Sequence, residues 1–169
     1  MDLITTLNNL GKSVKKQHRD VNRGGCCVFA SMVALELEKR GYKVQGIAAS
    51  HWAKNWDGKV ISITWARKKI EDNHPNHWSD HDVSFGHVGL EFKYKGRLYH
   101  YDTAGVNAKQ DTLDKMPIYR GRLSIDEMVE LAALDDGSWN PCFVRSEIPH
   151  IQRLVSWHFK RLDRSLARK

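Results

Sequence analysis

The hydrophobic residues of this chain recur first at helical and then at strand-like intervals. Near the start, Leu3, Leu7, Leu10 and Val14 lie three or four positions apart, which predicts a short amphipathic helix. Gly11 falls inside this pattern and is expected to be its weak point, because glycine is a poor helix former. The chain therefore opens with a helix that has one apolar face.

A second helix is predicted over residues 26–40, after a turn-rich segment at 20–25. Gly41 is a typical stop signal for it. Three apolar residues fall on one stripe of this helix, Phe29, Val33 and Leu37, and Val28, Met32 and Leu35 lie beside it.

Strand patterns follow the second helix. Residues 44–49 read as a short buried strand and 60–66 as an alternating one, whereas the polar, histidine-rich stretch 68–85 reads as a long loop. Two further strand-like runs, 87–93 and 97–102, are joined around Lys95-Gly96. This arrangement predicts a β-hairpin.

The C-terminal third predicts two more helices. Ser124 followed three residues later by Glu127 is a capping box, and it opens a helix that runs to about residue 134. A last amphipathic helix is predicted over 148–166. Its expected inward residues are Ile151, Leu154, Val155, Leu162 and Leu166.

Length and composition indicate one folded domain. The chain has 169 residues, with 41% hydrophobic and 28% charged residues, which suits a soluble protein with a real core. The patterns contain no internal repeat or convincing boundary. We therefore expect a single α+β domain over 1–169, with a core at about 20–105 and a helical part at about 123–168.

The formal net charge is +7, and the basic residues are concentrated near the two ends. Such a charge allows attraction to nucleic acid, acidic proteins or anionic surfaces. Solvated helix faces are the more frequent explanation. The sequence lacks zinc-finger spacing, an RNA-binding sheet motif and a basic zipper, so nucleic acid is only weakly supported as a partner.

Three cysteines, Cys26, Cys27 and Cys142, are an odd count with one adjacent pair. This is a poor disulfide framework, and the thiols are expected to be reduced. The N-terminus does not resemble a secretory signal, and no apolar run approaches the length needed to span a membrane. The expected location is the cytoplasm, without membrane association.

Three segments carry residues suited to cysteine-nucleophile chemistry. Cys26 follows Gly24-Gly25 and opens the second helix, whose unpaired amide groups favour a thiolate and could hold an oxyanion. His87 begins one strand of the hairpin, and Asp102 ends the other. Because strand starts and ends lie together in an antiparallel pair, the imidazole and the carboxylate are expected to meet.

These segments resemble the papain-like superfamily, and within it the transglutaminase-like branch. The matching motifs are Gly24 to Ala30 (GGCCVFA), His87 to Glu91 (HVGLE) and Tyr99 to Thr103 (YHYDT). The resemblance covers roughly residues 22–105. It selects Cys26, rather than Cys27, because the family nucleophile stands three positions before an aromatic residue. Small phage-encoded proteins often have this appearance, so a phage origin is a further expectation.

The resemblance implies a nucleophile helix packed on an antiparallel sheet, with Cys26, His87 and Asp102 as catalytic residues. It implies acyl transfer through a thioester, most simply by a thiol protease or amidase, with deamidation and transamidation open. Protein or peptide would be the substrate, and neither cofactor nor metal is required. Candidates for the oxyanion hole or cleft are Gln17, Asn22, Gly25, Trp52 and Trp78. Papain's oxyanion glutamine has no firm equivalent here, and Gly89 stands where related proteins often carry tryptophan.

Other interpretations remain open from the sequence. Cys26 could be a buried structural thiol, and Cys27 and Cys142 are best explained by packing. The chain could be an inactive papain-like module that binds a host protein or nucleic acid. The histidines of the segment 74–81 could suggest zinc, although their spacing fits no closed site well. The patterns do not predict an oligomeric state.

Overall fold

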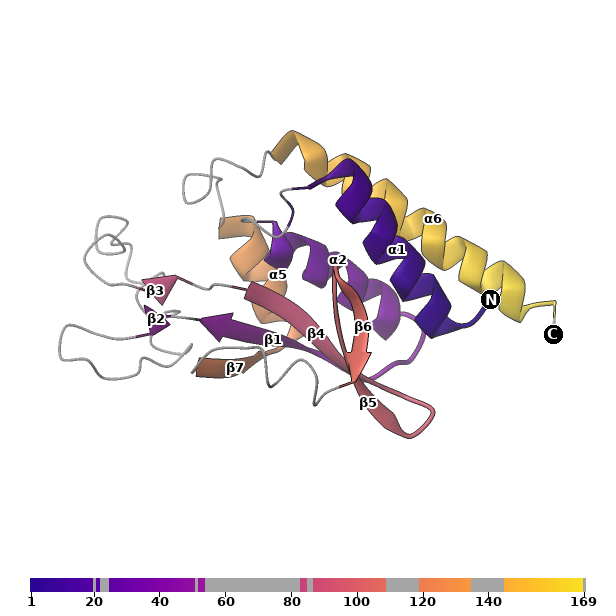
Figure 1. Ribbon diagram of the computed structural model, residues 1–169, viewed down its shortest axis with the longest axis horizontal. Coiled ribbons are helices and arrows are strands. Elements are labelled where there is room, and N and C mark those ends of the chain that lie inside the picture. Colours follow the sequence, from indigo (N-terminus) through magenta and orange to yellow (C-terminus); the bar gives the residue numbers. More distant parts are fainter. Residues whose placement is uncertain are drawn as a thin grey trace.

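The computed structural model shows an α+β fold in which helices pack on an antiparallel sheet (Figure 1). It describes residues 1–19, 21, 25–50, 52–53, 83–84, 87–108, 119–134 and 145–168. The helices there are α1 (Leu3–Gln17), α2 (Cys26–Glu38), α5 (Ile125–Leu134) and α6 (Ile148–Leu166), with a 3-10 turn at Arg145–Glu147. The strands are β1 (Val44–Ser50), β2 (Trp52–Ala53), β3 (Val83–Ser84), β4 (His87–Tyr94), β5 (Arg97–Asp102), β6 (Gly105–Ala108) and β7 (Tyr119–Leu123).

The main sheet has the strand order β6-β5-β4-β1-β7, and every neighbouring pair is antiparallel. β2 and β3 form a separate two-stranded ribbon. The predicted hairpin is confirmed as β4 and β5, which pair with Leu90 opposite Tyr101 and turn at Lys95-Gly96. Both turn residues have positive φ, +48° and +80°, as a tight two-residue hairpin requires.

Several sequence predictions are confirmed, with small corrections. The helix predicted over 26–40 ends at Glu38, and Gly41 follows it with φ +78°. The backbone amide of Gly41 donates to the carbonyl of Glu38, and that of Tyr42 to the carbonyl of Leu37, so the glycine does terminate the helix. The strand predicted at 60–66 lies outside the described residues, and the loop prediction over 68–85 is wrong at Val83–Ser84, which form β3.

The C-terminal helices also follow their predictions. Ser124 Oγ accepts from the amide of Glu127 at 3.1 Å, and Glu127 Oε2 accepts from the amide of Ser124 at 2.7 Å, which completes the capping box. α6 has the predicted bounds, but Leu166, expected to face inward, is exposed. Leu35 of α2, which lies beside the predicted stripe, is also exposed. The last turn of α6 and one edge of α2 thus lie outside the core.

The core fills the space between the helices and one face of the sheet. Strand alternation directs Val88, Leu90 and Phe92 of β4 to this face, and all three are buried. The ring of Tyr101, opposite Leu90, lies 5.9 Å from that of Phe29 in α2. Figure 1 shows α1, α2, α5 and α6 on one side of the sheet, with α1 and α6 forming an outer pair.

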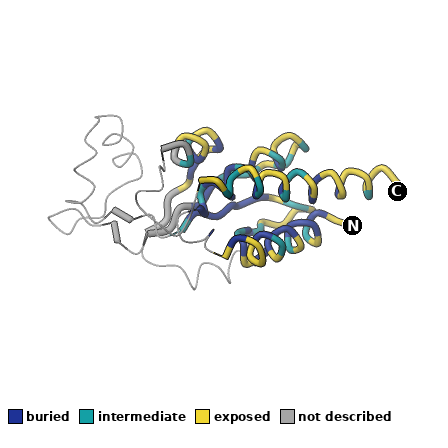
Figure 2. Tube along the Cα trace, turned by 90° about the horizontal axis from the view of Figure 1, so that it is seen from above, coloured by how far each residue is buried: buried dark blue, intermediate teal, exposed yellow. Residues whose placement is uncertain are grey.

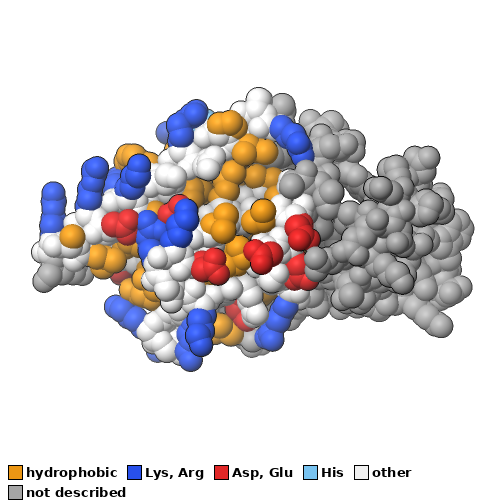
Figure 3. All heavy atoms as spheres, turned by 180° about the vertical axis from the view of Figure 1, so that it is seen from behind, with side chains coloured by type: hydrophobic (Ala, Val, Ile, Leu, Met, Phe, Trp, Pro, Cys, Tyr) orange, Lys and Arg blue, Asp and Glu red, His pale blue; other side chains and the backbone are white. Residues whose placement is uncertain are grey.

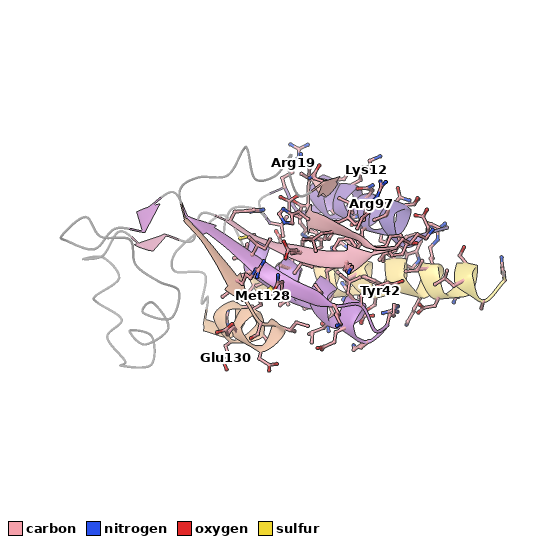
Figure 4. The ribbon with its side chains drawn as sticks, turned by 90° about the horizontal axis from the view of Figure 1, so that it is seen from below. Lys12, Arg19, Tyr42, Arg97, Met128 and Glu130 are labelled. Carbon is pink, nitrogen blue, oxygen red and sulfur yellow. The ribbon has the colours of Figure 1, made fainter. Side chains whose placement is uncertain are left out.

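Close packing at β1 requires a small residue. A Cβ atom at Gly46 would lie 2.5 Å from Met128 Sδ, so a larger residue there would displace the methionine. Figure 4 places Met128 between α5 and β1, whereas Glu130 lies on the outer side of the same helix. Among the described helices, none is long and apolar enough to cross a membrane.

Candidate functional site

Cys26 is the first residue of α2, and Gly25 is its N-cap. The amide of Phe29 donates to the carbonyl of Gly25 at 2.9 Å, which starts the helix and leaves the amides of the first turn without intrahelical acceptors. Gly25 supplies no side-chain cap, and the first turn carries no acidic residue. Within α2 and its N-cap, no acidic side chain therefore offsets the positive end of the helix dipole at the cysteine. Cys26 itself is nearly buried, with 8% of its surface exposed.

His87 and Asp102 meet where β4 begins and β5 ends. His87 Nε2 lies 2.8 Å from Asp102 Oδ2, which is hydrogen-bond distance. Continuing the register from Leu90 and Tyr101 places Gly89 opposite Asp102, so the aspartate reaches diagonally to the histidine. A Cβ atom at Gly89 would lie 3.1 Å from the Tyr101 carbonyl oxygen and 3.8 Å from Asp102 Cβ. The glycine thus keeps this side of the hairpin clear.

The second carboxylate oxygen of Asp102 is also engaged. Asp102 Oδ1 accepts a 2.7 Å hydrogen bond from the backbone amide of Ala104, within the turn that leads to β6. Burial raises the pKa of Asp102, but the hydrogen bond and charge of His87, the Ala104 amide and the nearby Lys15 outweigh burial and lower it overall. Asp102 is therefore held as a fixed carboxylate.

The ionisation of His87 responds to both partners. Burial lowers its pKa, but hydrogen bonds and charges from Asp102 and Cys26 outweigh that effect and raise the pKa to about 10. Cys26 therefore lies within interaction range of the ring, although it comes from a segment sixty-one residues earlier in the chain. The structure joins the imidazole to the carboxylate by a hydrogen bond, and Cys26 is a further group that raises the pKa of the ring.

α1 supports the turn that carries Asp102. A Cβ atom at Gly11 would lie 2.9 Å from the carbonyl oxygen of Thr103, so glycine allows the helix to touch this backbone. Asn8 Oδ1 accepts a 2.8 Å hydrogen bond from the amide of Val106. A Cβ atom at Gly105, which has φ +117°, would meet the same Asn8 oxygen at 2.7 Å. α1 therefore positions the backbone that follows Asp102.

Sequence reasoning missed this role of α1. A glycine inside a helical pattern often marks a close backbone approach, and Gly11 is such a signal. The hydrophobic pattern around it indicates only a weak point of the helix. The backbone that Gly11 approaches, at Asp102 and Thr103, has no hydrophobic pattern that would indicate the contact.

The remaining sequence candidates have different outcomes. Cys27 is partly exposed, and its thiol lies 3.4 Å from the carbonyl oxygen of Met128, consistent with a packing role. Gln17 is the exposed last residue of α1. Trp52 lies in β2, but its side chain is outside the described residues. Asn22, Trp78, Cys142 and the histidines at 74, 77 and 81 also lie outside them.

A second polar pair was not anticipated. His100 Nε2 lies 3.2 Å from Glu91 Oε2, and both side chains are buried on neighbouring strands. Gln45 donates to the other oxygen of Glu91, and Arg122 lies 3.8 Å from it. These residues follow the strand alternation of His87 and Gly89, so they continue along the same face of the sheet. Within the part of the chain that the structure describes, no group of three or more His, Cys, Asp or Glu could hold a metal ion.

Comparison with protein-family models, with curated proteins and with solved structures found no match for this chain.

Proposed function

We propose that this chain is a cysteine-nucleophile acyl-transfer enzyme that hydrolyses an amide bond in a protein or peptide. The observation that carries the proposal is the position of His87, hydrogen-bonded to Asp102 at 2.8 Å and influenced by the charge and hydrogen bonding of Cys26. A thiol, an imidazole and a carboxylate in this order are the groups that such a reaction requires.

Each residue has a distinct role in the proposed reaction. With its pKa raised to about 10, His87 already holds at neutral pH the proton that the Cys26 thiol has given up, and the sulfur attacks the carbonyl carbon of the substrate. His87 then gives that proton to the departing amine as the C–N bond breaks, which leaves a thioester on Cys26. Water attacks the thioester with His87 as base, releasing the acid and freeing the Cys26 sulfur.

The geometry supports a particular orientation of the ring. Because Nε2 of His87 faces Asp102, Nδ1 is the nitrogen left for the thiol. The pKa of His87 is raised to about 10, so the ring holds a proton readily when a thiolate is beside it. Asp102, fixed at both oxygens, orients the imidazole and stabilises its charged form.

The start of α2 would serve the oxyanion. Its first-turn amides, including that of Cys26, have no intrahelical acceptor and point toward the helix N-terminus. They could hold the oxyanion of the tetrahedral intermediate without a side-chain donor. This assignment would account for the lack of a clearly spaced glutamine before Cys26.

The fold is compatible with the transglutaminase-like branch of the papain-like superfamily. In that branch the nucleophile opens a helix packed on an antiparallel sheet, and the histidine and acid lie on neighbouring strands. α2 packs on β1 and β4 here, and His87 and Asp102 lie on β4 and β5. We therefore propose membership of this branch, with hydrolysis as the leading reaction because water is the simplest acyl acceptor.

Selective alkylation tests the proposal without a known substrate. Iodoacetamide is added below saturation at neutral pH, and the modified cysteines are located by peptide mass spectrometry. Cys27 is more exposed than Cys26, so accessibility alone predicts faster labelling of Cys27. Activation by His87 predicts the reverse order.

Two variants make the labelling result specific. His87→Ala should remove the excess rate at Cys26, whereas His100→Ala, which removes a buried imidazole of the same sheet, should leave that excess in place. Circular dichroism shows whether each variant is folded. Faster labelling of Cys27 in the folded wild-type protein, or an unchanged rate of Cys26 labelling in folded His87→Ala, would contradict the proposal.

A further inference from the structure

The positive charge of this protein comes from its two terminal segments. Residues 1–19 and 145–169 together hold eleven Lys or Arg and three Asp or Glu. The rest of the chain holds sixteen Lys or Arg and seventeen Asp or Glu, which nearly cancel. The segments form α1 and α6, which lie side by side as the outer pair of helices (Figures 1 and 2). The fold therefore gathers the net charge of +7 on one side of the molecule.

On α6 the charge is arranged as a stripe. We define the basic stripe of α6 as Arg153, Trp157, Lys160, Arg161, Arg164 and Arg168, all of them exposed. These residues recur at intervals of three or four, so they share one face of the helix, with Arg168 just past its end. At 1.5 Å per residue the stripe is about 22 Å long. The opposite face carries the buried Ile151, Val155, Phe159 and Leu162.

The acidic residues of the two terminal segments are already engaged. Asp163 accepts hydrogen bonds at 2.7 and 2.8 Å from Arg40, which lies just after α2. Glu147 lies 2.7 Å from His18, and Asp2 caps α1. No described carboxylate is paired with a member of the basic stripe. Seen from behind, the described surface mixes acidic, basic and hydrophobic side chains (Figure 3).

Trp157 interrupts the stripe with an exposed aromatic ring. Half of its surface is exposed, so core packing does not explain it. The guanidinium of Arg161 lies 4.6 Å from the ring centroid, which holds the indole beside the cationic row. An aromatic ring set among basic side chains offers both stacking to a base and attraction to phosphates.

We propose that the basic stripe of α6 binds single-stranded nucleic acid. A row of cations about 22 Å long suits a polyanion with regularly spaced charges. Trp157 favours a strand with accessible bases over a polyanion without bases, such as an acidic protein segment. A membrane surface fits less well, because the stripe has one apolar side chain rather than an apolar face. The proposal goes beyond the acyl-transfer proposal and does not depend on Cys26.

Fluorescence anisotropy with a labelled oligo-dT tests the proposal. Binding should weaken with salt, and removing one cation that neutralises a phosphate should reduce the slope of log K against log salt by about 0.7. Lys160→Ala/Arg164→Ala should therefore lower the slope by about 1.4. The matched control, Lys93→Ala/Arg97→Ala, removes the same charges from the β4–β5 hairpin and should retain most of the slope. Trp157→Ala should weaken binding roughly tenfold or more, because the base can no longer stack on the indole.

Competition experiments separate the alternatives. Unlabelled single strands should displace the probe, whereas polyglutamate and anionic phosphatidylserine vesicles should not. Cys26→Ala should bind as the wild type does, so loss of enzyme activity and loss of binding are separate results. Equal weakening by both charge-removing double variants, an unchanged affinity in folded Trp157→Ala, or displacement by polyglutamate at equal charge would overturn the proposal.

Discussion

Replacing Asp102 by asparagine isolates the effect of one charge on His87. Asparagine has nearly the same shape as aspartate and can still accept a hydrogen bond, so the substitution removes charge with little change of volume. In the wild type the side chains of His87 and Asp102 are both about four-fifths buried, and His87 Nε2 lies 2.8 Å from Asp102 Oδ2. The carboxylate therefore acts on the imidazole with little screening by water.

The expected change is a fall in the pKa of His87. Hydrogen bonds to charged groups contribute about 1.5–3 kcal/mol, and one pKa unit corresponds to about 1.4 kcal/mol. The wild-type pKa of about 10 should therefore fall by about one to two units. It should remain above the ordinary value of 6.5, because Cys26 also raises the pKa of the ring.

The sign of the stability effect follows from the same shift. Between pH 6.5 and about 10 the folded protein retains a proton on His87 that the unfolded chain has released. The stabilisation of the folded state by protonated His87 is complete below pH 6.5 and is lost as the pH rises through about 10. Asp102→Asn should shorten that pH window at its upper end.

An NMR titration of selectively labelled histidine measures the pKa directly. The His87 signal is assigned from its absence in His87→Ala, and Asp126→Asn, which removes an exposed carboxylate from α5, serves as the charge control. Asp126→Asn should leave the pKa of His87 unchanged. If Asp102→Asn folds and the pKa of His87 does not fall, the coupling argued from the structure is wrong.

Three further substitutions test a close backbone approach, a helix cap and a buried histidine. Gly11→Ala places a Cβ atom 2.9 Å from the Thr103 carbonyl oxygen. Urea unfolding should therefore show a loss of about 1–2 kcal/mol in stability, although alanine is the better helix former. A gain in stability would contradict the close approach. Ser124→Ala removes the capping-box acceptor for the Glu127 amide and should cost about 1 kcal/mol in the same assay; an unchanged midpoint would mean that the cap contributes nothing. Burial and the charge of Arg161 lower the pKa of His158, so the stability of the folded protein should decline as the pH falls below 6.5. His158→Gln should remove part of that decline. Identical profiles of stability against pH for the wild type and the variant would refute this role of His158.

Sequence periodicity was sufficient to predict the helices and the hairpin. α1 and α6 each bury one apolar face, α2 is an apolar helix that a glycine terminates, α5 opens with a capping box, and the hairpin has a clear turn at Lys95-Gly96. Such patterns are local, so they can be recognised without knowledge of the rest of the chain. The order of the strands, with β1 between β4 and β7, depends on long-range pairing that no local pattern encodes.

The site was predictable in part for the same reason. His87 and Asp102 lie on one hairpin, so their approach could be inferred from the turn that joins their strands. The supporting interactions of Asn8 and Gly11 could not, because they join α1 to a turn more than ninety residues away. The buried pair of Glu91 and His100 was also missed, since strand alternation shows which residues share a face but not whether that face is covered.

Intact-protein mass spectrometry with p-nitrophenyl acetate tests the central claim most directly. In a Cys27→Ser/Cys142→Ser background, Cys26 is the remaining thiol. Our account predicts rapid addition of one acetyl group to Cys26, followed by its hydrolysis, with both steps slowed strongly in folded His87→Ala. Absence of the adduct, or the same rates of formation and hydrolysis with and without His87, would contradict the account.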